Sequence, residues 1–213
     1  MTKKYEKTDL DSAYELETPD DSRRLYRAWA ESYDRTFAEE MRYIAPARLA
    51  ALFLERAGAD DSPVLDIGCG TGLVGEALDG RPLDGVDISP EMLAAARGKG
   101  CYRLLLEADL TRPLAFETAV YGGLISAGTF THGHVGPEPL DELVRIARPG
   151  ALFVLGINAA HYEAAGFAAA FDRLAGAGAI TVLEIAETPI YAHAASHDHV
   201  GDTLAAALFR RAG

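Results

Sequence analysis

VLDIGCGTGLVG, residues 64–75, is the stretch that decides the fold. Its apolar beginning predicts a buried strand, its glycines predict a tight turn, and its last residues predict the start of a helix. Because glycine has no Cβ, such a turn lets the backbone approach a ligand closely, and the helix that follows offers unpaired backbone N–H groups. The stretch therefore predicts a site for a nucleotide-like ligand at the carboxyl end of a strand.

The acid inside this stretch distinguishes two kinds of ligand. Gly70-x-Gly72-x-x-Gly75 also fits the fingerprint of dinucleotide-binding oxidoreductases. Asp66, however, is expected at the tip of the strand, where a carboxylate would crowd a pyrophosphate but could pair with the ammonium group of an amino acid. The residues favour a ligand with an amino-acid end, and a nucleotide-cofactor oxidoreductase stays an alternative.

Short apolar runs alternate with helical segments from residue 63 onward, which is typical of βαβ units around a parallel sheet. Strands are expected near 63–67, 83–88, 102–107, 121–126, 150–157, 179–192 and 203–210, and helices near 72–79, 90–98, 138–147 and 160–175. The last two strands are joined without room for a crossover helix, so they should pair antiparallel. The pattern predicts an α/β fold with a doubly wound seven-stranded sheet, mostly parallel with an antiparallel last strand.

The N-terminal part is expected to be helical. Residues 1–17 are polar and aperiodic, which predicts a mobile N-terminal arm. One domain is expected over residues 18–213, with a helical extension over 18–60 and an α/β core over 61–213. Thr18-Pro19 supplies the start of a first helix, and a second helix begins at Pro46 and ends at Gly58.

Aromatic side chains gather in this extension. Tyr26, Trp29, Tyr33 and Phe37 follow one another at spacings of three and four residues. Such a stripe belongs either to the core or to an apolar lid that excludes water from the site. We expect residues 25–43 to close over the ligand as a lid.

Two further acids are expected at the tips of the next two strands. Asp87 ends LDGVD and can accept both hydroxyl groups of a ribose. Asp109, in EADL, can accept a hydrogen bond from an exocyclic amine. Ser89 and Pro90 cap the following helix and place Met92 where it can lie against a base.

DIGCGTG, GVDIS and EADL together resemble the S-adenosylmethionine site of the class I methyltransferases, which have a Rossmann-like fold. WAESYD, residues 29–34, is similar to the WAxxYD segment of small-molecule members, including the group named for the Williams-Beuren region, where it forms part of a lid over the cofactor. The turn at residues 148–150 and the antiparallel final strand are also similar to the family's. The resemblance implies methyl transfer from S-adenosylmethionine to a small-molecule acceptor, with S-adenosylhomocysteine as the product.

The resemblance also implies a role for each motif. Asp66 and the backbone of the glycine turn would hold the methionine end of the cofactor, and Asp87 would accept from the ribose. Asp109 with Leu110 would hold the adenine. The expected cofactor contacts are Trp29, Tyr33, Asp66, Gly68, Cys69, Gly70, Thr71, Gly72, Asp87, Ile88, Met92, Asp109, Leu110, Ser126, Ala127 and Gly128.

SAGTFTHGHV, residues 126–135, follows the fourth strand and lacks the Asn/Asp-Pro-Pro-Tyr signature of enzymes that methylate amino groups and nucleobases. This segment borders the transferred methyl group in the family, so its sequence argues against adenine or glutamine as the acceptor. A base is needed only if the acceptor must lose a proton. His132 is the best-placed candidate because it titrates near neutrality, although a loop histidine bonded to the backbone is the other interpretation.

A metal site is not expected. His193, His197 and His199 lie within seven residues, but their spacing matches no zinc pattern, which favours a solvated hairpin over the pocket. Cys69 and Cys101 cannot build a disulfide framework and lack the spacing of a zinc site.

Charge and hydropathy exclude several classes of partner. The 213 residues include 20 Lys and Arg against 32 Asp and Glu, a net charge of −12, which repels phosphate backbones and anionic membranes. The apolar runs are too short to span a bilayer, and the first residues contain no apolar signal region. We therefore expect a cytoplasmic protein without nucleic-acid or membrane partners. A non-catalytic cofactor-binding module stays a second alternative, and the sequence specifies neither the acceptor nor the oligomeric state.

Overall fold

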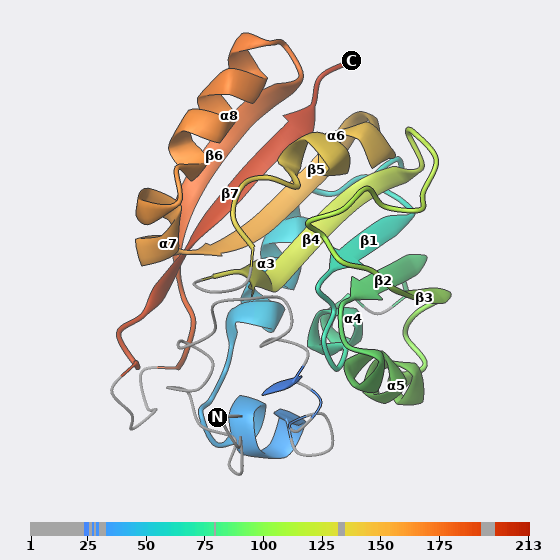
Figure 1. Cartoon of the computed structure of the whole chain (residues 1–213), viewed down its shortest axis with the longest axis vertical. Coiled ribbons are helices and arrows are strands. Elements are labelled where there is room, and N and C mark those ends of the chain that lie inside the picture. Colours follow the sequence, from blue (N-terminus) through green and yellow to red (C-terminus); the bar gives the residue numbers. More distant parts are fainter. Residues whose placement is uncertain are drawn as a thin grey trace.

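A seven-stranded sheet lies at the centre of the computed structural model (Figure 1), which describes residues 24, 25, 27, 29, 33–78, 80–131, 135–192 and 199–213. The strands are β1 (Val64–Ile67), β2 (Leu83–Asp87), β3 (Leu104–Glu107), β4 (Tyr121–Phe130), β5 (Ala147–Asn158), β6 (Ile180–Pro189) and β7 (Thr203–Arg211). Their order is β3-β2-β1-β4-β5-β7-β6. The first five strands are parallel, and β7 runs antiparallel to both β5 and β6. The predicted fold class is confirmed.

Helices cover both faces of this sheet. One apolar cluster joins it to α3 (Ala45–Arg56), α4 (Leu73–Ala77) and α5 (Pro90–Lys99), and a second joins it to α6 (Leu140–Ile146), α7 (Ala159–Ala164) and α8 (Phe167–Gly176). Successive side chains of β5 enter different clusters, since Val154 packs in the first and Phe153 in the second. A strand buried on both faces explains the continuous apolar runs of the sequence.

Two elements differ from the sequence-based expectation. The helix predicted over 160–175 is broken into α7 and α8, because Gly166 has a φ of +80° and ends the regular helical backbone. The strand predicted over 121–126 extends to Phe130, which pairs with Ile157 after a shift of register. This longer β4 carries Gly128 and Thr129 to the end of the sheet.

The N-terminal segment, coloured blue in Figure 1, lies beyond the carboxyl ends of the central strands. The predicted arm at 1–17 and the side chains of Tyr26 and Phe37 lie outside the described part of the chain. Leu25 and Trp29 are helical and almost fully buried in the cluster that contains α3. A π-helix, η1 (Tyr33–Glu39), follows them and precedes α3.

The strand order reverses direction at β1, which has β2 on one side and β4 on the other. In open α/β sheets a ligand crevice forms at such a switch point, outside the carboxyl ends of the strands. Ser126 Oγ and Thr129 Oγ1 both donate to the carbonyl oxygen of Ile67, each at 2.8 Å. These bonds fix the end of β4 against β1 and so define one wall of the crevice.

An ion pair between a half-buried arginine and a buried aspartate joins β7 to the loop before β1. Arg210 Nη1 lies 2.6 Å from Asp61 Oδ1, and the guanidinium also donates to the carbonyl oxygens of Gly150 and Arg56. Burial alone would raise the pKa of Asp61, but Arg210 and the backbone N–H of Gly58 hold it below its usual value. The Asp61 carboxylate thus contributes to stability only while it is ionised.

We expect Asp61→Asn to lower the free energy of unfolding at pH 7 by about 2–3 kcal/mol, because the guanidinium loses its counter-charge. The folded pKa lies below the unfolded value of about 3.9, so this contribution is present above about pH 4 and is lost as the pH falls through the folded pKa. Urea unfolding between about pH 7 and pH 3 measures the difference between variant and wild type.

Asp141→Asn is the matched control, since it removes the partner of Arg173 from an exposed ion pair. It should cost less than about 1 kcal/mol. A loss for Asp61→Asn that persisted undiminished at low pH would contradict the assignment.

Candidate functional site

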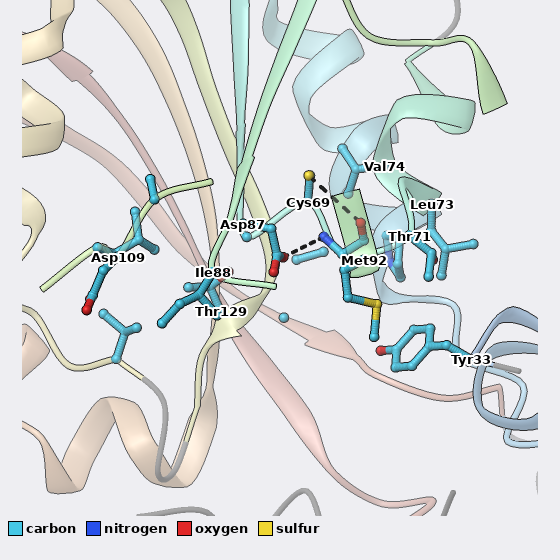
Figure 2. Close-up of a pocket in the computed structure, with 18 of the residues that line it drawn as sticks. Tyr33, Cys69, Thr71, Leu73, Val74, Asp87, Ile88, Met92, Asp109 and Thr129 are labelled. Carbon is cyan, nitrogen blue, oxygen red and sulfur yellow. Dashed lines mark hydrogen bonds between the residues drawn. The ribbon is translucent and has the colours of Figure 1, made fainter. Parts of the chain in front are cut away.

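A cavity opens at the carboxyl ends of β1, β2, β3 and β4, beneath the N-terminal segment (Figure 2). The expected cofactor contacts that line it are Tyr33, Gly68, Cys69, Gly70, Thr71, Asp87, Ile88, Met92, Asp109, Leu110, Ala127 and Gly128. Four expected contacts lie outside the lining: Trp29, Asp66, Gly72 and Ser126. Their direct contact with a cofactor stays a prediction, as does the role of His132, which lies outside the described residues.

Further lining residues were not singled out from the sequence as contacts: Tyr43, Pro46, Leu73, Val74, Ala108, Thr111, Thr129 and Val135. Leu73, Val74 and Ala108 belong to the quoted motifs, and Thr129 and Val135 belong to the segment after the fourth strand. Tyr43, Pro46 and Thr111 come from segments without a motif. Tertiary packing brings them there, and local sequence carries no signal for it.

The glycine turn adopts a conformation that favours glycine. Gly68, Gly70 and Gly72 have φ angles of +65°, +53° and +93°. A Cβ added to Gly68 would lie 1.9 Å from Thr129 Oγ1. A side chain at position 68 would therefore displace Thr129 from its bond to the carbonyl oxygen of Ile67.

Asp87 ties this turn to the end of β2. Its Oδ2 accepts from the N–H of Gly70 at 2.8 Å, the bond drawn in Figure 2, and its Oδ1 accepts from the N–H of Ser89 at 2.9 Å. Burial raises the pKa of Asp87, although these donors and the N–H of Ile88 oppose the rise. Each carboxylate oxygen has a second lone pair, so Asp87 holds the turn and still offers acceptors to a ligand.

The wall beyond Asp87 combines an acid with apolar side chains. Asp109 Oδ1 accepts from the N–H of Thr111 at 3.0 Å and from its hydroxyl at 2.6 Å. Met92 lies in the first turn of α5, where its N–H donates to the hydroxyl of Ser89 at 3.2 Å. In the view of Figure 2, Asp87 and Ile88 lie between Asp109 and Met92. Asp109 can thus accept hydrogen bonds from a ligand, while Ile88 and Met92 can pack against a flat apolar part of that ligand.

Asp66 lies beneath the turn and is completely buried. The hydroxyl of Tyr102 donates to Asp66 Oδ2 at 2.7 Å, whereas Oδ1 has no hydrogen-bond partner among the described residues. Burial raises the pKa of Asp66 to about 7; the Tyr102 bond opposes the rise, and the negative charge of Asp87 adds to it. Asp66 thus leaves one buried acceptor beside the turn without a partner among the described residues, and its contact with a ligand stays a prediction.

Asp34 fastens the N-terminal segment to the glycine turn. The hydroxyl of Thr71 donates to Asp34 Oδ1 at 2.5 Å, and Lys99 Nζ lies 2.7 Å from Asp34 Oδ2. Lys99 also pairs with Glu76 at 2.6 Å. Neither contact of Asp34 was predicted from the sequence, although Asp34 belongs to the WAESYD segment. The segment that contributes Tyr33 and Tyr43 to the cavity lining is thus held by polar contacts next to the glycine turn.

The opposite side of the cavity is largely apolar and aromatic. Tyr33 and Tyr43 come from the N-terminal segment, and Thr129 and Val135 from the end of β4 and the segment after it. The hydroxyl of Tyr43 donates to the carbonyl oxygen of Ala127 at 3.3 Å, and burial raises the pKa of Tyr43, so this hydroxyl stays protonated. No Lys or Arg belongs to the described lining.

A metal-binding cluster and a membrane-spanning helix are both absent from the described residues. No group of three His, Cys, Asp or Glu side chains among the described residues could hold a metal ion. His193 and His197 lie outside those residues, and His199 Nδ1 is 3.1 Å from Asp202 Oδ2. None of the described helices combines the length and the apolar character that crossing a bilayer requires.

Comparison with known proteins points to one family. A family model described as a methyltransferase domain matches residues 65–155. Methyltransferase-like protein 27 of Homo sapiens is 35% identical over 174 residues, which are 75% of this chain and 69% of that protein. The 18S rRNA (guanine-N(7))-methyltransferase of Bos taurus is 31% identical over 106 residues, which are 44% of this chain and 37% of that protein.

A solved structure shares the fold. The N-methyltransferase NodS from Bradyrhizobium japonicum, in complex with S-adenosyl-l-homocysteine, has a TM-score of 0.66 and 18% identity. The match covers 89% of this chain and 98% of that chain. At this level of identity the likeness concerns the fold alone.

These findings agree with the chemistry of the cavity. The hydrogen bonds to Asp66 and Asp87 from the described residues come from neutral donors. Their charges suit a ligand that carries a positive sulfonium and ammonium, and they oppose a pyrophosphate. S-adenosylmethionine is therefore the cofactor, and the oxidoreductase alternative is set aside. The resemblance drawn from the motifs is confirmed: this chain belongs to the class I S-adenosylmethionine-dependent methyltransferases.

Proposed function

We propose that this enzyme methylates a small-molecule acceptor by in-line displacement. The observation that carries the proposal is the acceptor side of the cavity, where Tyr33, Tyr43 and Val135 present rings and an aliphatic side chain and the described lining contains no cation. The net charge of −12 also disfavours an acceptor that carries phosphate groups. In the described lining, a phosphate-bearing acceptor would meet only carboxylates and neutral groups.

The chain's part in the reaction is binding and alignment. S-adenosylmethionine supplies a methyl group activated on a sulfonium. Asp87 accepts from the ribose hydroxyls, and Asp66 with the glycine turn holds the methionine end. Asp109 and Leu110 border the adenine. Alignment and the exclusion of water lower the barrier to displacement.

A base is required only for an acceptor that must lose a proton. His132 is our candidate, because it belongs to the segment between Thr129 and Val135, both of which line the cavity. Tyr43 is a poor base, since burial raises the pKa of its hydroxyl.

We expect Asp87→Ala to weaken the binding of S-adenosylhomocysteine by at least about 1.5 kcal/mol, or roughly tenfold, because a charged acceptor of hydroxyl hydrogen bonds is lost. Isothermal titration calorimetry measures the affinity. Glu107→Ala is the matched control: Glu107 is the exposed register neighbour of Asp87 on β3. Unchanged affinity in Asp87→Ala, or preference for NAD, would contradict the proposal.

The lid proposal predicts a change on binding. Hydrogen exchange in residues 33–43 should slow when S-adenosylhomocysteine is added, while exchange in the central strands stays the same. Asp34→Ala should reduce this protection because it removes the bonds to Thr71 and Lys99. Glu40→Ala, an exposed change in the same segment, should leave it intact. Equal protection with and without ligand would favour permanent packing over a lid.

An RNA acceptor is the competing possibility, because the relatives include 18S rRNA methyltransferases. We expect no salt-sensitive RNA binding, since the chain carries a net charge of −12. Fluorescence anisotropy with a labelled RNA hairpin at about 50 mM and 200 mM salt tests this, because phosphate contacts weaken steeply over that range. Tight binding at low salt that disappears at high salt would overturn the small-molecule proposal.

A further inference from the structure

Tyr102 lies outside every motif and outside the lining of the cavity. It belongs to the connection between α5 and β3, and its hydroxyl donates to Asp66 Oδ2 at 2.7 Å. Asp66 lies at the end of β1 and is completely buried. One side chain therefore reaches under the glycine turn to the carboxylate assigned to the methionine end of the cofactor.

Glycines make room for this ring. A Cβ added to Gly75 would lie 2.7 Å from both Cζ and the hydroxyl oxygen of Tyr102. At Gly72 and at Gly85, an added Cβ would lie 3.0 Å from a ring carbon of Tyr102. Two of these glycines belong to the motif at residues 64–75. Because these glycines are small, they leave room for the ring of Tyr102 and also let a ligand approach the backbone.

Tyrosine is suited to this position as a donor. Burial and the charge of Asp66 raise the pKa of Tyr102 far above its usual value, so the hydroxyl keeps its proton and donates at any neutral pH. The bond is neutral on the donor side. A Lys or Arg in its place would bind Asp66 more strongly but would repel the cationic ligand that Asp66 has to attract.

The other titratable groups that face Asp66 do not favour its ionised form. Asp87, at the end of β2, is negative and raises the pKa of Asp66, whereas the Cys69 thiol and the Tyr43 hydroxyl both have raised pKa values and stay neutral. The Tyr102 bond is the interaction that opposes protonation of Asp66.

We propose that Tyr102 is a positioning residue that keeps Asp66 charged and oriented beneath the glycine turn, with Oδ1 left for the amino end of S-adenosylmethionine. This inference rests on the proposed role of Asp66 at the methionine end. Tyr102 acts through Asp66 and needs no contact with the cofactor.

The test is the pH profile of S-adenosylhomocysteine binding, measured by calorimetry. Without the Tyr102 bond, Asp66 is protonated over more of the neutral range. Tyr102→Phe should therefore bind about five- to tenfold more weakly than wild type at pH 7 and within about twofold at pH 8.5. Gly75→Ala keeps the hydroxyl but displaces the ring, so it should move the profile in the same direction.

Tyr121→Phe is the matched control. Its hydroxyl donates to Asp84 Oδ2 at 3.1 Å, a tyrosine–aspartate bond near the start of β2, where Arg103 is a second partner of Asp84. This variant should keep the wild-type profile. A purely structural role for Tyr102 would instead weaken binding equally at every pH, and that result would overturn the proposal.

A double-mutant cycle tests the role of Tyr102 separately from the proposed function. Asp66→Asn should bind weakly, and adding Tyr102→Phe to it should cost nothing more, because the bond has already lost its charged acceptor. If Asp66→Asn loses affinity while Tyr102→Phe behaves as wild type, the role of Tyr102 is wrong and the proposed function stands. If the wild-type protein fails to bind S-adenosylhomocysteine, the proposed function falls and this inference with it.

Discussion

The carboxylates of Asp66 and Asp87, near the ends of the neighbouring strands β1 and β2, determine the charge that this end of the sheet offers to a ligand. Burial raises the pKa of both Asp66 and Asp87. A cation beside them would relieve their repulsion, but the hydrogen bonds to them from the described residues come from neutral donors: the N–H groups of Gly70 and Ser89 and the hydroxyl of Tyr102. Their negative charge is therefore available to a ligand. In the proposed binding mode the ammonium group of S-adenosylmethionine lies toward Asp66, and the ribose hydroxyls donate to Asp87.

Much of the fold follows from local sequence, because alternating apolar runs and helical segments leave few arrangements of a parallel sheet. The strands, their antiparallel end and the cofactor turn were all predictable. The break at Gly166 and the extension of β4 to Phe130 were missed. A glycine inside a helical pattern is often tolerated, and only the pairing of Phe130 with Ile157 lengthens the strand.

The candidate site, like the fold, could be predicted only in part from the sequence. Its strand-end acids and its glycines could be located by position alone, since the carboxyl ends of parallel strands meet at one edge. Tyr102, Asp34 and Thr129 could not, because each acts on a residue at least 36 positions away in the sequence. The glycines at 72, 75 and 85 leave space for the ring of Tyr102. The sequence of the motif does not specify which side chain fills that space.

The two halves of the cavity are built with different rigidity. The cofactor half consists of the turn and strand ends of a sheet buried on both faces, where a change in one side chain disturbs the packing of its neighbours. The acceptor half comes from the N-terminal segment and the end of β4, and contacts such as Tyr43 with Ala127 and Asp34 with Thr71 hold it in place. Contacts of this kind contribute about 1 kcal/mol each. Leu25 and Trp29 of the N-terminal segment are buried in the core cluster, so changes that preserve the fold are expected at lining residues such as Tyr33 rather than at these two. The motifs therefore identify the methyl donor and leave the acceptor to be found by experiment.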